Sequence, residues 1–447
     1  METALNWDII TQEAVHHLQA LLRIDTTNPP GNESAAAEYL AGVLRAESYE
    51  PIVLEAAPGR GNCITRCRGD GSQLPLLLYS HTDVVPAEPS QWTHAPFSGD
   101  VADGWVWGRG ALDMKSTTIM QLMTMLLLKR HAPSLHRDVI FAATADEEHD
   151  SDIGAEWLVK HHPDLVRAEY GLSEHGGYTL HIEGRRFYPI QTAEKGTCWL
   201  RIRATGRPGH GAVPHADNAV VHLSRAIDRV TAQPLPLHVT PTAADYVQRI
   251  AQAIGGSFGS TLSATLNPRL HAAALKRLPN PAFADTLHAI LHNTVSPNQL
   301  RAGYKVNVIP SEAEAMLDGR MLPGFDVASF LAEVQPRLGD GIAIEIEHTS
   351  PPLEVPADTP LFNAIEQQLI RSDPAAIVLP YMLTGATDAK LFAQLGTKCY
   401  GFAPMIIEPE SPFDGLIHGH DERITIAALA FGVRGLFETV RDFCSIG

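Results

Sequence analysis

The chain has 447 residues, of which 45% are apolar, and its formal net charge is −17. A chain of this length can bury a large core, and we expect two domains rather than one. The acidic balance and the lack of any basic run in the sequence exclude a nucleic-acid-binding surface from the expected functions. The five cysteines are scattered and odd in number, which favours a reducing compartment over a disulfide framework.

The first ten residues, METALNWDII, contain no basic segment followed by an apolar one, so we expect no signal peptide. No apolar run of the sequence approaches the roughly 20 residues needed to cross a bilayer. We therefore expect a cytoplasmic protein with neither a membrane nor a nucleic acid as partner.

The N-terminal part of the chain alternates between helical and strand patterns. Short apolar runs predict strands at residues 51–54, 62–67, 76–79, 139–143 and 168–172. Helical spacing is found at residues 6–24, 34–46, 117–130 and 154–161. Ser34 is expected to cap the second of these helices. Alternating strands and helices indicate an α/β domain with a mostly parallel sheet covered on both faces.

The pattern changes near residue 190. Alternating stretches and amphipathic helices then predict an inserted α+β domain whose elements span residues 197–204, 217–232, 243–253, 281–292, 305–320, 326–337 and 342–347. The α/β pattern returns after a Pro-rich stretch at 351–359, with a helix, a strand and a final helix at residues 360–370, 399–402 and up to about 443. We therefore expect a discontinuous domain, residues 1–190 and 353–447, and an inserted domain, residues 191–352.

Residues 76–115 carry the pattern with the clearest chemistry. His81 follows the predicted strand 76–79, and Asp83 comes two residues later. Functional side chains of α/β proteins lie at strand ends, and this pair suggests a metal ligand whose second ring nitrogen is held by a carboxylate. Asp113 ends the stretch GRGALD just before an apolar helix. Taken alone, His81 and Asp113 also fit a surface histidine and a helix cap.

The motif SHTDVVP, followed by PFSGDVADGWVWGRGALDMK, resembles the paired metal-binding signature of the dinuclear zinc amidohydrolases and exopeptidases. This family includes aminoacylase, glutamate carboxypeptidase, succinyl-diaminopimelate desuccinylase and the carnosinase-type dipeptidases. The resemblance extends from about residue 10 to 440 and is weakest at 233–300, which is longer than the family's minimal lid. It implies a catalytic zinc-peptidase domain, residues 1–190 and 353–447, and a lid or dimerisation domain, residues 191–352.

The resemblance also implies two Zn²⁺ ions per chain, and its nitrogen and oxygen donors suit Co²⁺ or Mn²⁺ as well. The implied ligands are Asp113 for both ions, His81 and Glu174 for one, and Glu148 and His418 for the other. Two alternatives stay open, because His175 follows Glu174 directly and His420 lies two residues after His418.

The adjacent glutamates receive different roles. Neighbouring side chains point in different directions, so Glu147 and Glu148 cannot easily face one ion together. The resemblance assigns Glu148 as a metal ligand and Glu147 as the general base. Asp83 is also expected to be a catalytic residue. Taken alone, the run DEE also fits a solvated helix cap. The resemblance further implies a cis peptide between Asp113 and Met114.

Substrate residues are implied at four positions. Arg320, in MLDGRMLPG, resembles the arginine that clamps a substrate carboxylate, for which a planar guanidinium is suited. A surface arginine is the alternative. Asn307 and Gly385 are expected to line the same pocket. His210, in GRPGHGAVP, resembles the lid histidine that polarises the scissile carbonyl in the neighbouring subunit's site, which implies a homodimer.

Together these features predict a metal-dependent hydrolase of dipeptides or N-acyl amino acids that carry a free carboxylate, with attack by a water shared by the ions. The stretches SHTDVVP, RMLPG and GFAPM favour the aminoacylase and carboxypeptidase branch. The alternatives are a desuccinylase or deacetylase of an amino-acid biosynthetic intermediate, and a non-catalytic binding protein on the same fold. The latter would be expected to have lost Glu147 or a ligand.

Overall fold

The computed structural model describes residues 5–131 and 134–445. Its chain divides into two compact units: the first comprises Met1–Thr192, Val355–Pro380 and Thr387–Gly447, and the second comprises Ala193–Glu354 and Tyr381–Ala386. The second unit is therefore an insertion into the first. None of the helices in the described ranges is long and apolar enough to cross a membrane.

The largest sheet has a parallel centre and antiparallel flanks. Its strand order is β1-β2-β6-β3-β7-β18-β9-β16, with β8 and β17 also pairing with β9. The strands are β1 (Ile52–Ala57), β2 (Arg60–Cys67), β3 (Leu76–His81), β6 (Val139–Thr144), β7 (Tyr170–Ser173), β8 (Leu180–Ile182), β9 (Arg185–Glu194), β16 (Leu353–Glu354), β17 (Ile377–Leu383) and β18 (Lys398–Gly401). The neighbours β6, β3, β7 and β18 run parallel, whereas β1, β2 and β9 pair antiparallel. The predicted α/β class with an inserted α+β part is confirmed.

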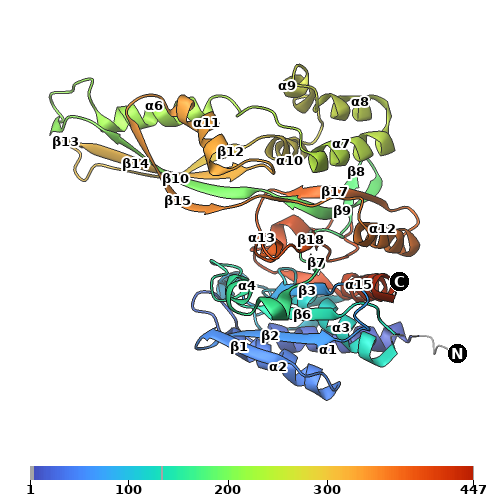
Figure 1. Cartoon of the computed structure of the whole chain (residues 1–447). Helices are drawn as coiled ribbons and strands as arrows, with labels where there is room; N and C mark the ends of the chain where they lie inside the picture. The colour runs from blue at the N-terminus through green and yellow to red at the C-terminus, as the bar shows by residue number, and fades with distance from the viewer. Residues whose placement is uncertain (1–4, 132–133, 446–447) are drawn as a thin grey trace. The chain divides into compact units, whose positions relative to one another are not determined.

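Helices pack against this sheet in two groups (Figure 1). One group contains α1 (Trp7–Leu22), α2 (Glu33–Ala46), α3 (Lys115–His131), α12 (Pro360–Ser372) and α15 (Ile426–Ser445). The other contains α4 (Ala155–His161), α5 (Pro163–Val166) and α13 (Ala389–Ala393). Every residue of α3 from Lys115 to Leu128 is buried, which is typical of a central helix surrounded by protein. The unit also has a short helix, α14 (Phe413–Leu416), and a small sheet of β4 (Val101–Ala102), β5 (Trp105–Trp107) and β19 (Arg423–Thr425).

The prediction that Ser34 caps the second helix is wrong. Helix α2 begins at Glu33 and its N-cap residue is Asn32, so Ser34 lies in the first turn. The first residue of the helix, Glu33, has a buried carboxylate that accepts hydrogen bonds from Arg60 at 2.6 and 2.7 Å. The Ser34 hydroxyl donates to Glu55 on the neighbouring strand instead.

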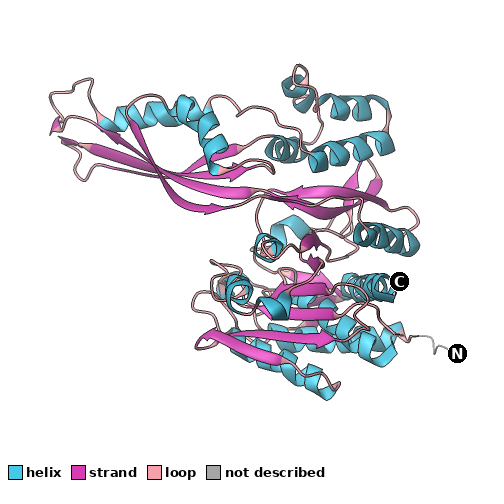
Figure 2. Cartoon of the chain, viewed as in Figure 1, coloured by secondary structure: helices cyan, strands magenta, loops and turns pink. Residues whose placement is uncertain are grey.

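The second unit is built on an antiparallel sheet in the order β12-β14-β10-β15. Its elements are β10 (Gly196–Thr205), β12 (Thr294–Ala302), β14 (Glu312–Met321), β15 (Ile342–Ser350), a ribbon of β11 (Gly209–His210) and β13 (Val308–Ile309), and helices α6 (Ala219–Thr231), α7 (Pro241–Ile254), α8 (Gly256–Ala264), α9 (His271–Leu275), α10 (Pro281–Leu291) and α11 (Val327–Leu338). Burial alternates along β14, as expected of a sheet with one covered face, and the helices lie on that side (Figure 2).

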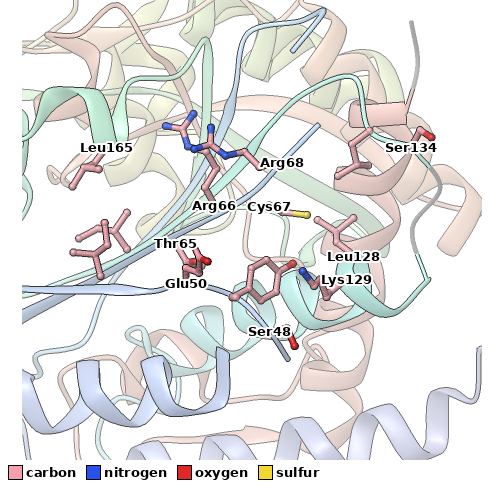
Figure 3. Close-up of a pocket in the computed structure, with 14 residues that line it drawn as sticks. Ser48, Glu50, Thr65, Arg66, Cys67, Arg68, Leu128, Lys129, Ser134 and Leu165 are labelled. Carbon is pink, nitrogen blue, oxygen red and sulfur yellow. The ribbon is translucent and has the colours of Figure 1, made fainter. Parts of the chain in front are cut away.

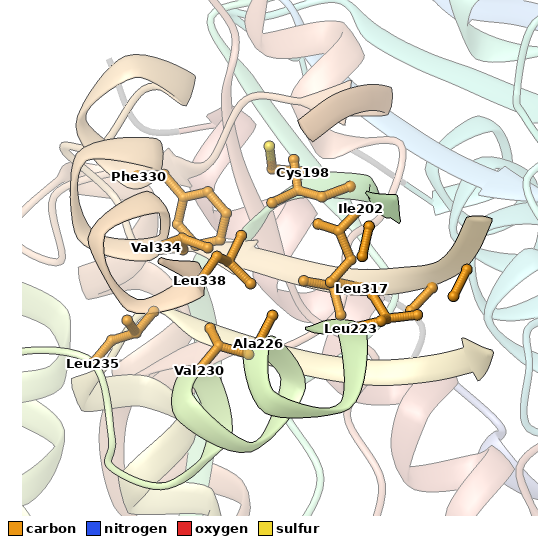
Figure 4. Packing of buried hydrophobic residues seen from close by; sticks show 14 of the residues in the cluster. Cys198, Ile202, Leu223, Ala226, Val230, Leu235, Leu317, Phe330, Val334 and Leu338 are labelled. Atoms are coloured by element: carbon orange, nitrogen blue, oxygen red, sulfur yellow. The ribbon is translucent and has the colours of Figure 1, made fainter. Parts of the chain in front are cut away.

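The core of the second unit lies between this sheet and two helices (Figure 4). Leu223, Ala226 and Val230 line the inner face of α6 at helical spacing, and Phe330 and Val334 do so on α11. These side chains pack against alternate residues of β10 and β14. The apolar periodicity in the sequence therefore marks the face of each element that is buried.

The two main boundaries of the units lie two residues after the predicted ones, and one further segment is placed differently. Residues 381–386 belong to the second unit, whereas the sequence pattern assigned all of 353–447 to the first. The reason is that β17 extends to Leu383, whose carbonyl accepts a 3.1 Å hydrogen bond from Lys195 N, at the start of the second unit.

Candidate metal centre

The candidate ligands follow the carboxyl ends of neighbouring strands. Strand β3 ends at His81, β6 ends three residues before Glu147, and β7 ends one residue before Glu174. The sheet order β6-β3-β7 places these parallel strands side by side, so their carboxyl ends lie at one edge. Asp113 comes before α3, and His418 follows α14. The local folds thus deliver side chains from five parts of the chain to one edge.

Two groups of possible ligands share Asp113. The ligand atoms of His81, Asp113 and Glu174 lie within 4.8 Å of one another, and so do those of Asp113, Glu148 and His418. His81 Nε2 lies 3.1 Å from Asp113 Oδ1, and His418 Nε2 lies 3.2 Å from Asp113 Oδ2. The two imidazoles therefore face opposite oxygens of one carboxylate, the arrangement needed for a carboxylate that bridges two ions.

Glu147 lies beside these groups but belongs to neither of them. Its Oε2 is 3.8 Å from His81 Nε2, the same distance that separates Glu174 Oε2 from that nitrogen. The next residue, Glu148, turns towards His418 instead, with its Oε2 3.1 Å from His418 Nε2. The two adjacent glutamates thus point to different parts of the centre.

The two alternative histidines stand outside both groups. His175 Nε2 is 3.5 Å from Glu174 Oε2, so its ring is a neighbour of the centre rather than a member of either triad. His420 is exposed and lies in neither triad. The geometry favours Glu174 and His418 as the ligands.

Two carboxylates of the centre are buried beside other groups of like charge. Burial, followed by repulsion from Glu174, raises the pKa of Glu147 well above its ordinary value. Burial, followed by repulsion from Asp113, does the same to the pKa of Glu174. Oε1 of Glu148 is buried and has no hydrogen-bond partner among the described residues. Two divalent cations would offset this repulsion and bind the unpaired oxygen, so the residues fit such ions.

The histidines are also influenced by these carboxylates. Burial lowers the pKa of His81, but contacts with Asp113 and Asp83 outweigh burial and raise it well above its ordinary value. Hydrogen bonds to Asp113 and Glu148 raise the pKa of His418 to about 10. The carboxylates around each ring favour a positive charge there. A cation bound by the ring would be favoured by the same carboxylates.

Asp83 has a different contact from the one expected. Nδ1 of His81 lies 3.0 Å from the backbone carbonyl of Asp83 and 3.5 Å from its carboxylate, so the carbonyl is the nearer partner of the ring. The carboxylate accepts hydrogen bonds from Asn28 Nδ2 at 2.9 Å and from the backbone N–H groups of Glu147 and Glu148 at 3.1 Å each. Asp83 therefore holds in place the loop that carries both glutamates.

Comparison with known proteins agrees with this geometry. Residues 77–442 match the model of the family described as Peptidase family M20/M25/M40. The chain belongs to this family. The resemblance inferred from SHTDVVP and GRGALDMK is confirmed, and membership makes the chain a metallohydrolase of the peptidase and aminoacylase type.

Curated relatives and solved structures give the degree of similarity. The chain is 29% identical over 390 residues to human N-fatty-acyl-amino acid synthase/hydrolase PM20D1, covering 83% of this chain and 75% of the relative. It is 28% identical over 421 residues to aminoacylase-1 of Sus scrofa, covering 92% and 90%. The M20 family metallo-carboxypeptidase Sso-CP2 of Sulfolobus solfataricus shares its fold, with a TM-score of 0.72, 18% identity and coverage of 97% and 100%. Human carnosine dipeptidase 1 does so with a TM-score of 0.66, 14% identity and coverage of 98% of each chain.

The loop before α3 gives the M20-family centre its shape. Gly110 has φ +90°, and a Cβ at this position would approach Cγ1 of Val84 to 2.8 Å. Only glycine fits such a backbone without strain. The peptide between Asp113 and Met114 is cis, as the resemblance implied.

Glu422 is a supporting residue whose role the sequence pattern did not reveal. Its carboxylate is fully buried, pairs with Arg109 at 2.7 Å, and accepts backbone N–H groups of Gly110, Leu112 and Asp113 at 2.7–3.0 Å. One carboxylate thus fixes the loop that carries Asp113. The sequence places Glu422 four residues after His418 and gives no indication of this contact.

A second supporting network lies behind Asp83. Asn28 Nδ2 donates to Asp83 and to Asp146, each at 2.9 Å, and Arg60 donates to Asp146 at 2.9 Å and to Glu33 at 2.6 Å. None of these partners is adjacent to another in the sequence. The network joins the N-terminal loop to the loop after β6, and local patterns could not have predicted it.

The predicted substrate residues belong to the second unit. The guanidinium of Arg320 donates to both carboxylate oxygens of Asp318, at 2.8 and 3.2 Å. His210 ends β11 and Asn307 directly precedes β13; both are exposed, and Gly211 N donates to Asn307 O at 2.9 Å. Gly385 lies in the piece 381–386. The roles of these four residues remain predictions.

A cavity of about 610 Å³ lies elsewhere in the first unit (Figure 3). Its lining includes Tyr49, Arg66, Cys67, Arg68 and Lys129. None of the candidate metal ligands lines this cavity, so it is not part of the centre.

Proposed function

We propose that this chain cleaves the amide bond of N-acyl amino acids or dipeptides that carry a free carboxylate, with two divalent ions as cofactors. The observation that carries the proposal is the position of Asp113 between two groups of ligands, with Glu147 beside both and in neither. The named relatives support the substrate class, since they include an N-fatty-acyl-amino acid synthase/hydrolase and an aminoacylase.

Five side chains would hold the ions. Asp113 would bind both ions, His81 and Glu174 would bind the first ion, and Glu148 and His418 would bind the second. When bound, such ions polarise a carbonyl oxygen and lower the pKa of water to about 7. We assign proton transfer to Glu147, which takes the proton of the attacking water and passes it to the leaving amine. Asp83 and Glu422 act as positioning residues, because they hold the backbone of the loops that carry the acidic side chains.

In the same proposal the second unit recognises the substrate. The planar guanidinium of Arg320 would exchange its contact with Asp318 for the substrate carboxylate, and Asn307 and Gly385 would line the pocket. His210 would donate a hydrogen bond to the developing oxyanion in the site of a partner subunit, so the active form would be a homodimer. No disulfide joins any two of the five cysteines, all of which lie in the described residues, and this supports a cytoplasmic location.

A hydrolysis screen tests the proposal. Metal-free protein would be supplied with Zn²⁺, Co²⁺ or Mn²⁺ and offered N-acyl amino acids, dipeptides and the corresponding C-terminal amides. We expect metal-dependent release of the free amino acid from the acids and much slower cleavage of the amides. Hydrolysis that continues after metal removal, or equal rates for acids and amides, would contradict the proposal. The same screen identifies the preferred metal and acyl group.

A further inference from the structure

A cluster of three histidines lies in residues 233–300, the part of the second unit that exceeds the minimal lid. His271 begins α9, His288 lies in α10, and His292 follows α10 directly. One possible ligand atom from each ring lies within 4.8 Å of the others. His271 and His292 are 7% and 3% exposed, so two of the three rings are buried. The proposed hydrolysis uses none of them.

Backbone carbonyls determine the tautomer of the two buried rings. Nδ1 of His271 lies 2.6 Å from Thr265 O, and Nδ1 of His292 lies 2.6 Å from Leu235 O and 3.1 Å from Pro236 O. A carbonyl oxygen can only accept a hydrogen bond, so both Nδ1 atoms carry a proton. In the neutral rings each Nε2 is then an unprotonated acceptor.

These two Nε2 atoms face each other at 2.9 Å. Two nitrogen lone pairs at this distance repel each other unless a positive species lies between them. A shared proton and a metal ion are the two candidates. A histidine with Nδ1–H bound to a backbone carbonyl and Nε2 free for coordination is typical of metal ligands.

The surroundings favour the metal ion over the proton. Burial and the nearby positive groups of His271 and Lys195 lower the pKa of His288, and Asp285, the carboxylate that acts on this ring, does not outweigh them. Lys195 Nζ donates to the carbonyl of His292 at 2.8 Å and to that of Ala289 at 2.9 Å, which adds a further positive group nearby. An unpaired buried imidazolium is costly in such surroundings. A metal ion is instead held by direct bonds to the nitrogen lone pairs.

We propose that His271, His288 and His292 form a third metal site, for zinc or another divalent first-row ion that prefers imidazole ligands. Three histidines and one water complete a tetrahedral zinc site. The ring centroids of His288 and His292 are 4.4 Å apart, and those of His271 and His292 are 4.9 Å apart. His288 thus lies next to the buried pair and supplies the third nitrogen.

The site would have a structural role. It joins α9 and α10 to the segment at Leu235 and Pro236, through the rings and through their carbonyl partners. Helix α9 has five residues, which is too short for a helix to be stable by its own hydrogen bonds. A bound ion would hold this helix to its neighbour.

Anomalous diffraction tests the site in the wild-type chain. Crystals grown from zinc-loaded protein should give a peak at the zinc edge about 2.0–2.1 Å from Nε2 of His271 and from Nε2 of His292, in addition to any peaks at the Asp113 groups. Absence of a peak at the histidines would overturn the proposal and leave the shared proton as the explanation. This result does not depend on whether the chain hydrolyses N-acyl amino acids.

Metal stoichiometry gives a second measurement. His271→Gln, His288→Gln and His292→Gln should each bind one zinc ion per chain fewer than wild type, whereas His222→Gln, a histidine of α6 outside the cluster, should bind the wild-type number. Hydrolysis with the Asp113 groups filled should continue in all four variants. Equal zinc content in wild type and the cluster variants would overturn the proposal. Should a variant not fold, the diffraction experiment on wild type decides alone.

Discussion

The carboxylate of Glu422 accepts a 3.0 Å hydrogen bond from the backbone N–H of Asp113, the residue whose two oxygens face His81 and His418. Glu422 is itself fully buried and paired with Arg109. It therefore holds in place the backbone that carries the Asp113 carboxylate. The geometry of the centre depends on this second layer as well as on the ligands.

Glu422→Gln should weaken metal binding at both groups by about 10–100-fold, because an outer residue that orients a ligand typically has this effect. The change also removes the charged partner of Arg109, whose remaining partners are the backbone carbonyls of Gly419 and Pro86, and the loss should cost about 3–5 kcal/mol of stability. Competition with a chelator measures the affinity, and thermal unfolding of the metal-free protein measures the stability. The control is Asp421→Asn, since Asp421 contacts Thr93 at 2.6 and 2.8 Å and not the centre. Equal losses in the two variants would assign Glu422 no special role.

Glu147→Gln and Glu148→Gln should separate catalysis from metal binding. Glu147→Gln should keep both ions and lose about 10²–10⁴-fold in kcat, because only proton transfer is removed. Glu148→Gln should lower the metal content towards one ion per chain, since Glu148 faces His418 in the second group. Metal analysis and steady-state kinetics on the same samples check both statements. The division of roles fails if both variants lose metal equally.

The stability of the metal-free protein should depend on His418 in a pH-dependent way. The pKa of His418 is raised from 6.5 to about 10 by Asp113 and Glu148, so its protonated ring stabilises the fold below pH 6.5 and this contribution is lost as the pH rises towards 10. The side chain is 52% exposed, which limits the contribution to about 1 kcal/mol.

Urea unfolding of metal-free wild type and His418→Gln across this pH range measures the effect. The difference in free energy of unfolding should shrink as the pH rises. Zinc should reverse the trend, because a metal binds the neutral ring. A difference that stays constant with pH in the metal-free protein would contradict the contact with Asp113 and Glu148.

Much of the centre could be predicted because its ligands follow recognisable strands. β3 and β6 are short, fully buried apolar runs, and their ends identify His81 and the pair at 147–148. The supporting residues could not be predicted in this way. Glu422 is 309 residues from Asp113, and Asp83 is 64 residues from Glu147. Such contacts are created by the tertiary fold, and the local pattern around either partner does not record them.

The fold also has elements that the sequence predicted and elements that it did not. The amphipathic helices α6 and α11 were predictable because their apolar residues repeat with helical spacing. β9 was missed: eight of its ten residues are buried, so it shows no alternation, and it runs across the predicted domain boundary near 190. Helices α8 and α9, of nine and five residues, are too short to give a clear period.

Arg320→Ala should lower kcat/KM steeply for acid substrates and much less for the corresponding C-terminal amides. Arg320→Lys should recover little, because a point charge cannot replace a planar guanidinium. Asp318→Asn is a matched control: it removes the present partner of Arg320 and should not weaken recognition of the acids. Steady-state kinetics on paired acid and amide substrates checks the prediction. Equal losses for both substrates in Arg320→Ala would give Arg320 a structural role.

Mixed dimers should reveal whether His210 serves the neighbouring subunit. His210→Ala and Glu147→Ala should each be nearly inactive alone. In a dimer of one of each, one site combines an intact Glu147 with an intact His210 from the partner subunit, and the other site lacks both. Random mixing makes about half of the dimers mixed, so activity should return to roughly a quarter of wild type.

The two variants must be co-expressed or refolded together, and differently tagged chains allow the mixed dimer to be isolated and counted. Each variant refolded with itself is the control and should stay inactive. If His210 acted within its own chain, every site of a mixed dimer would keep one defect, and mixing would restore nothing. In the mixed dimer, an intact Glu147 and an intact His210 are always on different subunits. A purified mixed dimer without activity would therefore exclude a site shared between subunits.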